Sequence, residues 1–123
     1  MPKLSYFTVG SNKLEKAKVF YDALLSQAGM APRFEHPSGG RLYGGEAGMF
    51  GVLGPHDGKP ATVGNGVMAG FAMDSREDVD AFYNKALELG GTCEGPPGER
   101  APGVYFAYFR DLDGNKLCAF KFG

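Results

Sequence analysis

An internal repeat constrains the fold more than any other feature of this sequence. The segment Tyr21-Asp-Ala-Leu-Leu-Ser-Gln-Ala-Gly29 aligns without a gap with Tyr83-Asn-Lys-Ala-Leu-Glu-Leu-Gly-Gly91, which lies 62 residues further along the 123-residue chain. Phe20 is likewise matched by Phe82, and Leu25 by Leu87. Because the offset is about half the chain length, the repeat predicts one supersecondary unit built twice.

The helix of each copy follows from the spacing of its apolar residues. In the second copy Val79, Phe82, Tyr83, Ala86 and Leu87 form one helical stripe, with Ser75 as the N-cap and Gly90-Gly91 as the stop. The first copy has a similar stripe over residues 14–28, with Ser11 or Asn12 as the cap and Gly29 as the stop. The apolar stripe of each helix must pack against another element, and the neighbouring strands predict that this element is a β-sheet.

The expected strands are short and lie on both sides of each helix. Strand-like runs occupy residues 4–9, 32–36, 40–45 and 49–53, and then 67–73, 91–95, 104–110 and 116–122, with Asp113-Gly114 as the last hairpin turn. The order strand, helix, three strands, written twice, predicts an α+β fold of two βαβββ modules. Module one covers about 1–54, the linker 55–63 and module two 64–123. The Pro/Gly-rich segment 95–103 is too long for a hairpin turn and is expected to be a lid or a loop at a pocket edge.

Charge and composition exclude several classes of function. Thirteen Lys and Arg against 14 Asp and Glu give a net charge of -1 without a basic run, which argues against nucleic-acid and anionic-membrane partners and favours a small-molecule ligand. No run approaches the roughly 18–20 apolar residues of a membrane span, and no signal-peptide core is visible, so a cytoplasmic location is expected. Cys93 and Cys118 lack metal or disulfide spacing and are predicted to be free thiols.

The repeat and its last hairpin resemble a known family. The βαβββ duplication, the Phe-Tyr pair in each helix and the ending Phe109-Arg-Asp-Leu-Asp-Gly-Asn-Lys-Leu117 are similar to the vicinal oxygen chelate superfamily, which includes glyoxalase I, bleomycin-resistance proteins and extradiol dioxygenases. The resemblance covers nearly the whole chain. It implies two modules whose sheets curl around a cleft, a divalent metal held there by His and Glu in the active members, and a tendency to form homodimers.

The positions that correspond to the family's metal ligands hold other residues. Tyr6 stands in place of the first-strand His, Met68 in place of the second-module His and Cys118 in place of the last-strand Glu, and the segment 49–52 offers no ligand side chain. A phenol must lose its proton to bind a divalent ion, and a thioether is soft and neutral. The sequence therefore predicts no metal and no other cofactor, and it disfavours metal-dependent lyase or dioxygenase chemistry.

The aromatic residues give the positive indication of function. Tyr105-Phe-Ala-Tyr-Phe109 alternates large rings onto both faces of one strand, so one set packs on a helix while the other lines a cavity. The sequence predicts a ring-lined, metal-free ligand pocket, with polar contacts from Arg41, Glu46 or Arg110. Its expected lining residues are Tyr6, Phe50, Met68, Tyr105, Tyr108, Cys118 and Phe120.

The predicted function is therefore binding or sequestration of a small, partly aromatic molecule, as in bleomycin-resistance proteins. The alternative is an enzyme, either a glyoxalase-like lyase or isomerase or a dioxygenase relative, with a rebuilt active site in which Tyr6 or Glu46 is the catalytic base. A third interpretation is an accessory protein that has no cavity. His36 and His56 are expected to be exposed loop residues.

Overall fold

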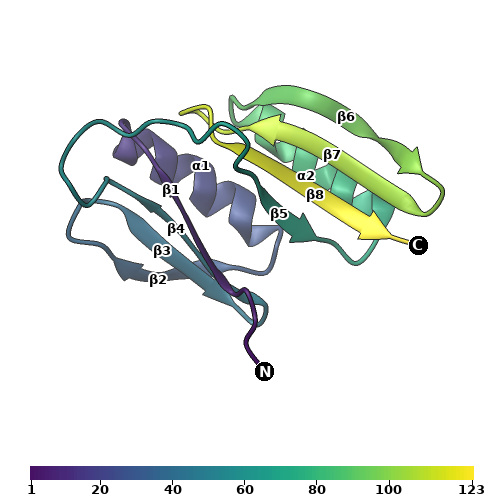
Figure 1. Ribbon diagram of the computed structural model, residues 1–123, viewed down its shortest axis with the longest axis horizontal. Coiled ribbons are helices and arrows are strands. Elements are labelled where there is room, and N and C mark those ends of the chain that lie inside the picture. Colours follow the sequence, from purple (N-terminus) through teal and green to yellow (C-terminus); the bar gives the residue numbers. More distant parts are fainter. The chain divides into compact units, whose positions relative to one another are not determined.

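The same order of elements occurs twice along the chain. The computed structural model describes residues 1–123 as two units, Met1–Val63 and Gly64–Gly123 (Figure 1). The first unit contains β1 (Tyr6–Gly10), α1 (Leu14–Ser26), β2 (Ala31–Glu35), β3 (Arg41–Gly45) and β4 (Gly48–Leu53). The second contains β5 (Ala69–Ala72), α2 (Arg76–Glu88), β6 (Thr92–Ala101), β7 (Val104–Arg110) and β8 (Lys116–Phe122).

Each unit has one mixed four-stranded sheet with the same topology. The strand order is β1-β4-β3-β2 in the first unit and β5-β8-β7-β6 in the second. The first and last strands of each unit pair in parallel, and the other pairs are antiparallel. A parallel pair needs a crossover connection, and the helix of each unit lies on that path. The α+β fold with two βαβββ modules is confirmed.

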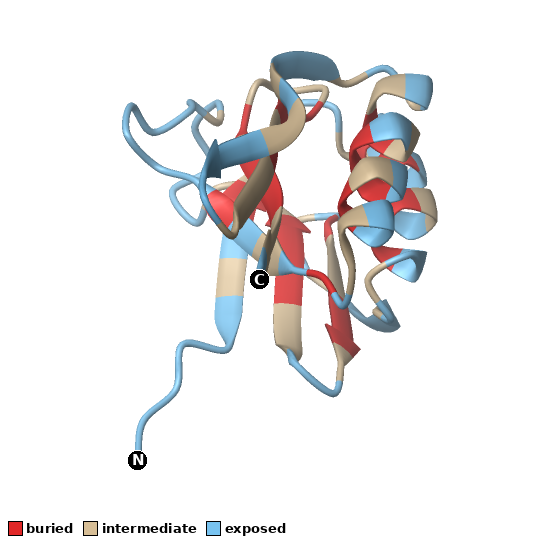
Figure 2. Cartoon of the chain, turned by 90° about the vertical axis from the view of Figure 1, so that its right-hand side faces the viewer, coloured by how far each residue is buried: buried red, intermediate tan, exposed pale blue.

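The two helices reproduce the sequence repeat and bury the predicted stripes. They begin 62 residues apart, at Leu14 and Arg76, and each has 13 residues. In both helices the buried and exposed residues lie on opposite sides (Figure 2). The buried residues are Ala17, Phe20, Tyr21, Leu24 and Leu25 in α1, and Val79, Phe82, Tyr83 and Ala86 in α2. Neither helix is long and apolar enough to cross a membrane.

One of the two predicted helix caps is present. The Ser75 hydroxyl accepts a hydrogen bond from the backbone N–H of Asp78 at 3.0 Å, as an N-cap does. The N-cap of α1 is instead Lys13, which makes no side-chain cap bond. Asn12 has another role, because its side-chain amide exchanges two hydrogen bonds with the backbone of Ala61, at 2.9 and 2.7 Å. It thus ties the linker to the end of β1.

The segment 95–103 is mostly strand, so the prediction of a lid or pocket-edge loop is wrong. β6 runs to Ala101, and its pairing with β7 shifts register between Cys93 and Gly95, between Gly95 and Gly98, and between Glu99 and Ala101. β6 is an edge strand, where proline leaves no central ladder bond unmade, and bulges absorb the extra residues. The prolines and glycines between residues 95 and 101 therefore lie in a strand and not in a loop.

Each helix is joined to its sheet by the same kind of polar bond. The Tyr43 hydroxyl on β3 donates to Asp22 Oδ1 on α1 at 2.6 Å, and the Tyr105 hydroxyl on β7 donates to Asp80 Oδ1 on α2, also at 2.6 Å. Burial and the Asp22 carboxylate raise the pKa of Tyr43, and the bond to Asp80 raises the pKa of Tyr105. Both phenols therefore stay protonated and serve as donors.

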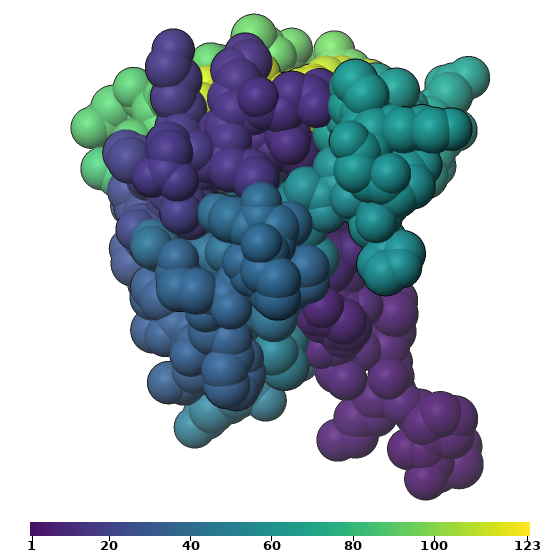
Figure 3. All heavy atoms as spheres, turned by 90° about the vertical axis from the view of Figure 1, so that its left-hand side faces the viewer, coloured from purple at the N-terminus to yellow at the C-terminus, as the bar shows by residue number.

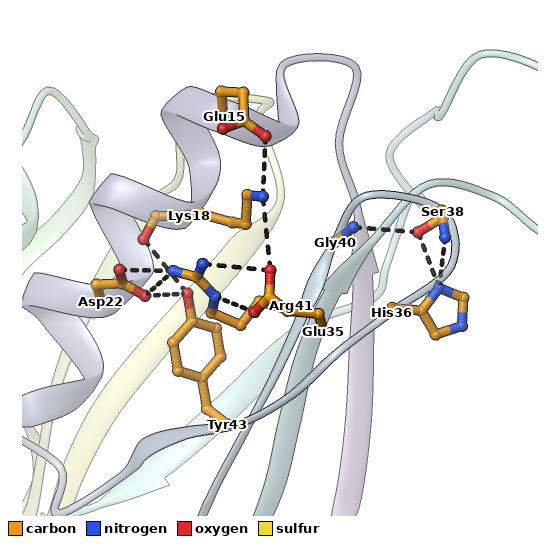
Figure 4. A network of polar contacts seen from close by, with 9 residues as sticks. All are labelled: Glu15, Lys18, Asp22, Glu35, His36, Ser38, Gly40, Arg41 and Tyr43. Carbon is orange, nitrogen blue, oxygen red and sulfur yellow. Dashed lines mark hydrogen bonds and ion pairs between the residues drawn. The ribbon is translucent and has the colours of Figure 1, made fainter.

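In the first unit this bond belongs to a larger polar network. The Arg41 guanidinium donates to both carboxylate oxygens of Asp22, at 3.0 and 2.8 Å, and to Glu35 Oε2 at 2.6 Å (Figure 4). These hydrogen bonds raise the pKa of Arg41 and lower the pKa of Glu35. Arg41, a predicted polar contact for a ligand, is therefore a structural link between α1, β2 and β3.

Removal of either tyrosine hydroxyl tests these links. We expect Tyr43→Phe to lower the free energy of unfolding by about 1–2 kcal/mol, because Tyr43 is fully buried and Asp22 loses a donor. Tyr105→Phe removes a bond of equal length from a half-buried ring, so its loss is smaller. Equilibrium urea unfolding of both variants measures the difference. Equal losses, or a larger loss for Tyr105→Phe, would contradict this account.

Candidate functional site

A single helix covers one face of each sheet and leaves the other face open. In the first unit Tyr21 of α1 packs on Phe50 at a centroid distance of 5.1 Å, which marks the covered face of that sheet. The open face carries exposed rings at Tyr6 and Phe34, 53% and 60% exposed. Register places the following residues on it: Tyr6, Thr8, Phe34, Leu42, Met49 and Leu53.

The open face of the second sheet is more aromatic. Phe82 of α2 packs on Phe71 and Phe109, which marks the covered face. Alternation then places the neighbouring residues of β7 and β8 on the other side. Four rings gather there, and we call them the ring cluster: Phe106, Tyr108, Phe120 and Phe122.

The ring cluster is a continuous set of contacts rather than isolated rings. Phe106 stacks on Phe120 with centroids 5.1 Å apart and planes 13° apart, and on Tyr108 at 5.7 Å and 20°. Phe122 touches Phe106 at 5.9 Å and Phe120 at 5.3 Å. Three of the rings are half-buried, and Phe122 is 60% exposed. The cluster therefore offers both ring faces and ring edges at the surface of the unit.

Strand register explains why these rings meet. Phe106 lies directly opposite Phe120 in the antiparallel β7–β8 pair, and Tyr108 lies opposite Cys118. Directly opposite and diagonal neighbours are close enough for aromatic side chains to touch. The cluster is thus a consequence of period-two alternation on two adjacent strands.

Two cationic side chains lie against the Tyr108 ring. The Arg100 guanidinium carbon and the Lys116 Nζ are each 5.3 Å from the ring centroid. Arg100 comes from β6 and Lys116 from β8, the two neighbours of β7. Neither forms an ion pair with a carboxylate, whereas Arg110 on the same face pairs with Glu94 at 2.8 Å. One end of the ring cluster is therefore positively charged.

Cys118 lies below this surface and is not a nucleophile. Its side chain is 1% exposed, and a Cβ added at Gly70 would lie 3.2 Å from its Sγ. Burial raises the pKa of the Cys118 thiol to about 11, and the Lys116 charge offsets this only in part. The thiol is protonated at neutral pH, so it packs as a small apolar group.

A separate pocket of about 480 Å³ lies in the first unit, where the parallel strands β1 and β4 end. Residues of the linker form one wall, and the linker is the teal ridge in Figure 3. His36 and His56 both line this pocket. His36 is half-buried rather than exposed as predicted, and its Nδ1 accepts a hydrogen bond from the backbone N–H of Ser38 at 3.1 Å. His56 is exposed, as predicted.

Comparison with known proteins gives the family. Residues 3–119 match the model of the Glyoxalase/Bleomycin resistance protein/Dioxygenase superfamily. The chain belongs to this superfamily. A glyoxalase/bleomycin resistance protein from Albidiferax ferrireducens T118 is 48% identical, with a TM-score of 0.87 over 95% of this chain and 96% of that one. No curated protein matches the sequence.

More distant relatives share the fold alone. A lactoylglutathione lyase from Agrobacterium tumefaciens is 17% identical, with a TM-score of 0.73 over 98% of this chain and 93% of that one. The fosfomycin resistance protein FosX from Mesorhizobium loti is also 17% identical, with a TM-score of 0.72 over 100% of this chain and 94% of that one. At 17% identity these two structures show a shared fold, and a shared fold does not imply a shared activity.

The donor set does not fit the divalent metal that the family implies. Tyr6 lies opposite Met49 on the first open face, and a phenol must lose its proton before it can bind a divalent ion. In the second unit Met68 is a neutral thioether and Cys118 a protonated thiol. No three His, Cys, Asp or Glu side chains group so that they could hold a metal ion. We derive no chemistry through a metal at these positions.

The structure does not bring the predicted pocket residues together on one sheet face. Tyr108 and Phe120 lie in the ring cluster with Cys118 beneath them, and Met68, 39% exposed, directly precedes β5. Tyr6 lies on the open face of the first sheet. Phe50 and Tyr105 lie on the helix-covered faces, as their contacts with Tyr21 and Asp80 show. Glu46 lies in the exposed turn between β3 and β4.

Sequence reasoning missed Phe106, Phe122 and the two cations at Tyr108. Alternation along residues 105–109 leaves two choices of face, and the prediction included Tyr105 from one set and Tyr108 from the other. The structure separates the two sets, because Tyr105 and its repeat equivalent Tyr43, 62 residues earlier, both bond the helix of their own unit. Phe106 and Tyr108 then belong together on the open side.

Selective thiol modification tests the environment of Cys118. Cys93 is exposed and should react with 5,5′-dithiobis(2-nitrobenzoate) in the native protein, whereas Cys118 should react only after unfolding. At pH 8, three units below a pKa of about 11, roughly a thousandth of the Cys118 thiol is ionised. Cys93→Ser should abolish the native reaction, and Cys118→Ser should preserve it. Rapid native labelling of the Cys93→Ser variant would contradict the burial of Cys118.

Proposed function

We propose that this protein binds a small, flat, partly aromatic molecule on the ring cluster, without help from a divalent metal. The observation that carries the proposal is the mutual stacking of Phe106, Tyr108 and Phe120 on a sheet face that no helix covers. Half-buried rings in one layer present a continuous apolar surface with π faces and edges. A flat ligand can stack on it or meet it edge-on.

Exposure of these aromatic rings to water is unfavourable in free energy. A contiguous apolar patch on a sheet face is a typical feature of a ligand or interaction site. A ligand that covers these rings gains the free energy of removing apolar area from water, about 25 cal/mol for each Å². Polar groups at the edge then fix its orientation, as in most small-molecule sites.

Binding explains this face better than catalysis does. The titratable groups on it are Tyr108, the protonated thiol of Cys118, the ion-paired Arg110 and Glu94, and the two cations. None of these is a free carboxylate or imidazole that could act as a general base. The lyase, isomerase or dioxygenase alternative would need Tyr6 or Glu46 as its base, and these belong to the first unit. The homodimer and the cytoplasmic location stay predictions.

Two bicyclic probes, 2-naphthamide and 2-naphthoate, test the proposal. Because the chain has no tryptophan, naphthalene fluorescence reports binding directly. We expect Phe122→Ala to weaken binding roughly two- to tenfold, the value of one aromatic contact of about 0.5–1.5 kcal/mol. Binding should persist in excess EDTA.

Phe34→Ala is the matched control. Phe34 and Phe122 are each 60% exposed on an open sheet face, but only Phe122 belongs to the ring cluster. The control should bind both probes like the unmodified protein. The proposal fails if neither probe binds, if EDTA abolishes binding, or if the two alanine variants have the same effect.

A further inference from the structure

We propose that the ligand of the ring cluster carries a carboxylate, which binds beside Tyr108 to Arg100 and Lys116. This inference rests on the proposed function and names the chemical class of the ligand: a small aromatic acid. Three observations carry it, namely the way Arg100 is held, the position of Lys116, and the balance of charge around them.

Arg100 is exposed, and its guanidinium is bonded to the backbone of its own strand. Its Nη1 donates to the Gly98 carbonyl at 3.0 Å and its Nη2 to the Pro96 carbonyl at 2.6 Å, while its guanidinium carbon lies 5.3 Å from the Tyr108 centroid. A guanidinium has five N–H donors, so these two bonds leave three for another acceptor. A preformed fork of this kind suits a planar carboxylate.

Two glycines of β6 lie directly beneath the guanidinium and the Tyr108 ring. A Cβ at Gly98 would lie 3.1 Å from Arg100 Nη1, and a Cβ at Gly95 would lie 3.0 Å from the Tyr108 ring and 3.3 Å from Arg100 Nη2. Side chains at either position would therefore press on the guanidinium, and at Gly95 also on the ring. The unusual composition of this strand lets the cation and the phenol lie flat against its backbone.

Lys116 adds a second positive charge at the same ring. Its Nζ is 5.3 Å from the Tyr108 centroid, and its charge acts on the buried Cys118 thiol, whose pKa it lowers against the larger effect of burial. The side chain is half-buried and makes no ion pair. Its ammonium group therefore remains available to a negatively charged ligand beside the Tyr108 ring.

The surrounding carboxylates have other partners. Glu94 pairs with Arg110, and Glu99 pairs with Arg76 at 3.0 Å beside Tyr105 on the covered side. Asp111 accepts backbone N–H groups of Asp113 and Asn115 inside the β7–β8 turn. Arg100 and Lys116 thus form no ion pair with these carboxylates, and both lie against the ring of Tyr108. The complementary ligand joins a flat ring to a negative group.

The experiment compares 2-naphthoate with 2-naphthamide, which share one ring system and differ in charge. We expect 2-naphthoate to bind roughly tenfold more tightly than 2-naphthamide at low salt, because its carboxylate accepts charge-assisted hydrogen bonds. This difference in affinity should shrink as salt is added, because salt screens the charges. Arg100→Gln and Lys116→Met should each reduce naphthoate affinity several-fold and leave naphthamide affinity nearly unchanged. The double variant should bind the two probes alike.

Lys121→Met is the matched control for Lys116→Met. Lys121 lies on the same strand, but register places it opposite Tyr105, on the helix-covered face. It should leave the preference for naphthoate intact. Loss of the preference in this control would mean that general charge, rather than the two cations at Tyr108, attracts the acid, and the inference would fail.

The outcomes separate this inference from the proposed function. Equal or tighter binding of 2-naphthamide, still sensitive to Phe122→Ala, overturns the carboxylate and leaves the ring cluster as a binding site. If neither probe binds, both proposals fail. A second copy of the chain seated on the cluster is tested by light scattering: if Phe122→Ala dissociates an oligomer that excludes the probes, the face is an interface and both proposals are overturned.

Discussion

A single helix against a four-stranded sheet is the constraint on which the rest of this structure depends. Each unit has one helix of 13 residues, and its apolar stripe covers only one face of the sheet. The tyrosine–aspartate bonds, Tyr43 to Asp22 and Tyr105 to Asp80, hold each helix on that face. The other face is then left to be covered by something else, and its residues are free to serve a function.

This constraint also explains which parts of the structure the sequence could predict. The repeat predicted the order of elements, because the same 62-residue offset relates both helices, and the structure adds that the two sheets have the same strand order. Alternation predicted that residues 105–109 send rings to both sides. It could not decide which side is open, since both sides carry aromatic residues. Tyr105 was therefore grouped with Tyr108, although Tyr105 lies under α2, and Phe50 of β4 likewise lies under α1.

The edge strand β6 shows where local rules fail. Proline and glycine usually mark a loop, and residues 95–103 contain both in excess. At a sheet edge the missing N–H of proline costs no central bond, and the register shifts on both sides of Gly95 take up the irregular backbone. Pairing with β7 in a hairpin, which turns at Pro102 and Gly103, decided the structure, and rules based on turn residues alone do not describe such pairing.

The replacement of the family's metal ligands and the composition of β6 have a common physical meaning. A metal site attracts oxygen-rich ligands by charge at one point, and the chain has lost the carboxylates and imidazoles that such a site needs. In their place the second unit offers a layer of rings and, at one end, two cations that no carboxylate neutralises. The positive charge on this face is carried by side chains whose N–H groups can donate hydrogen bonds. Such a site can recognise a negative group by hydrogen bonds and charge, and it can release it unchanged.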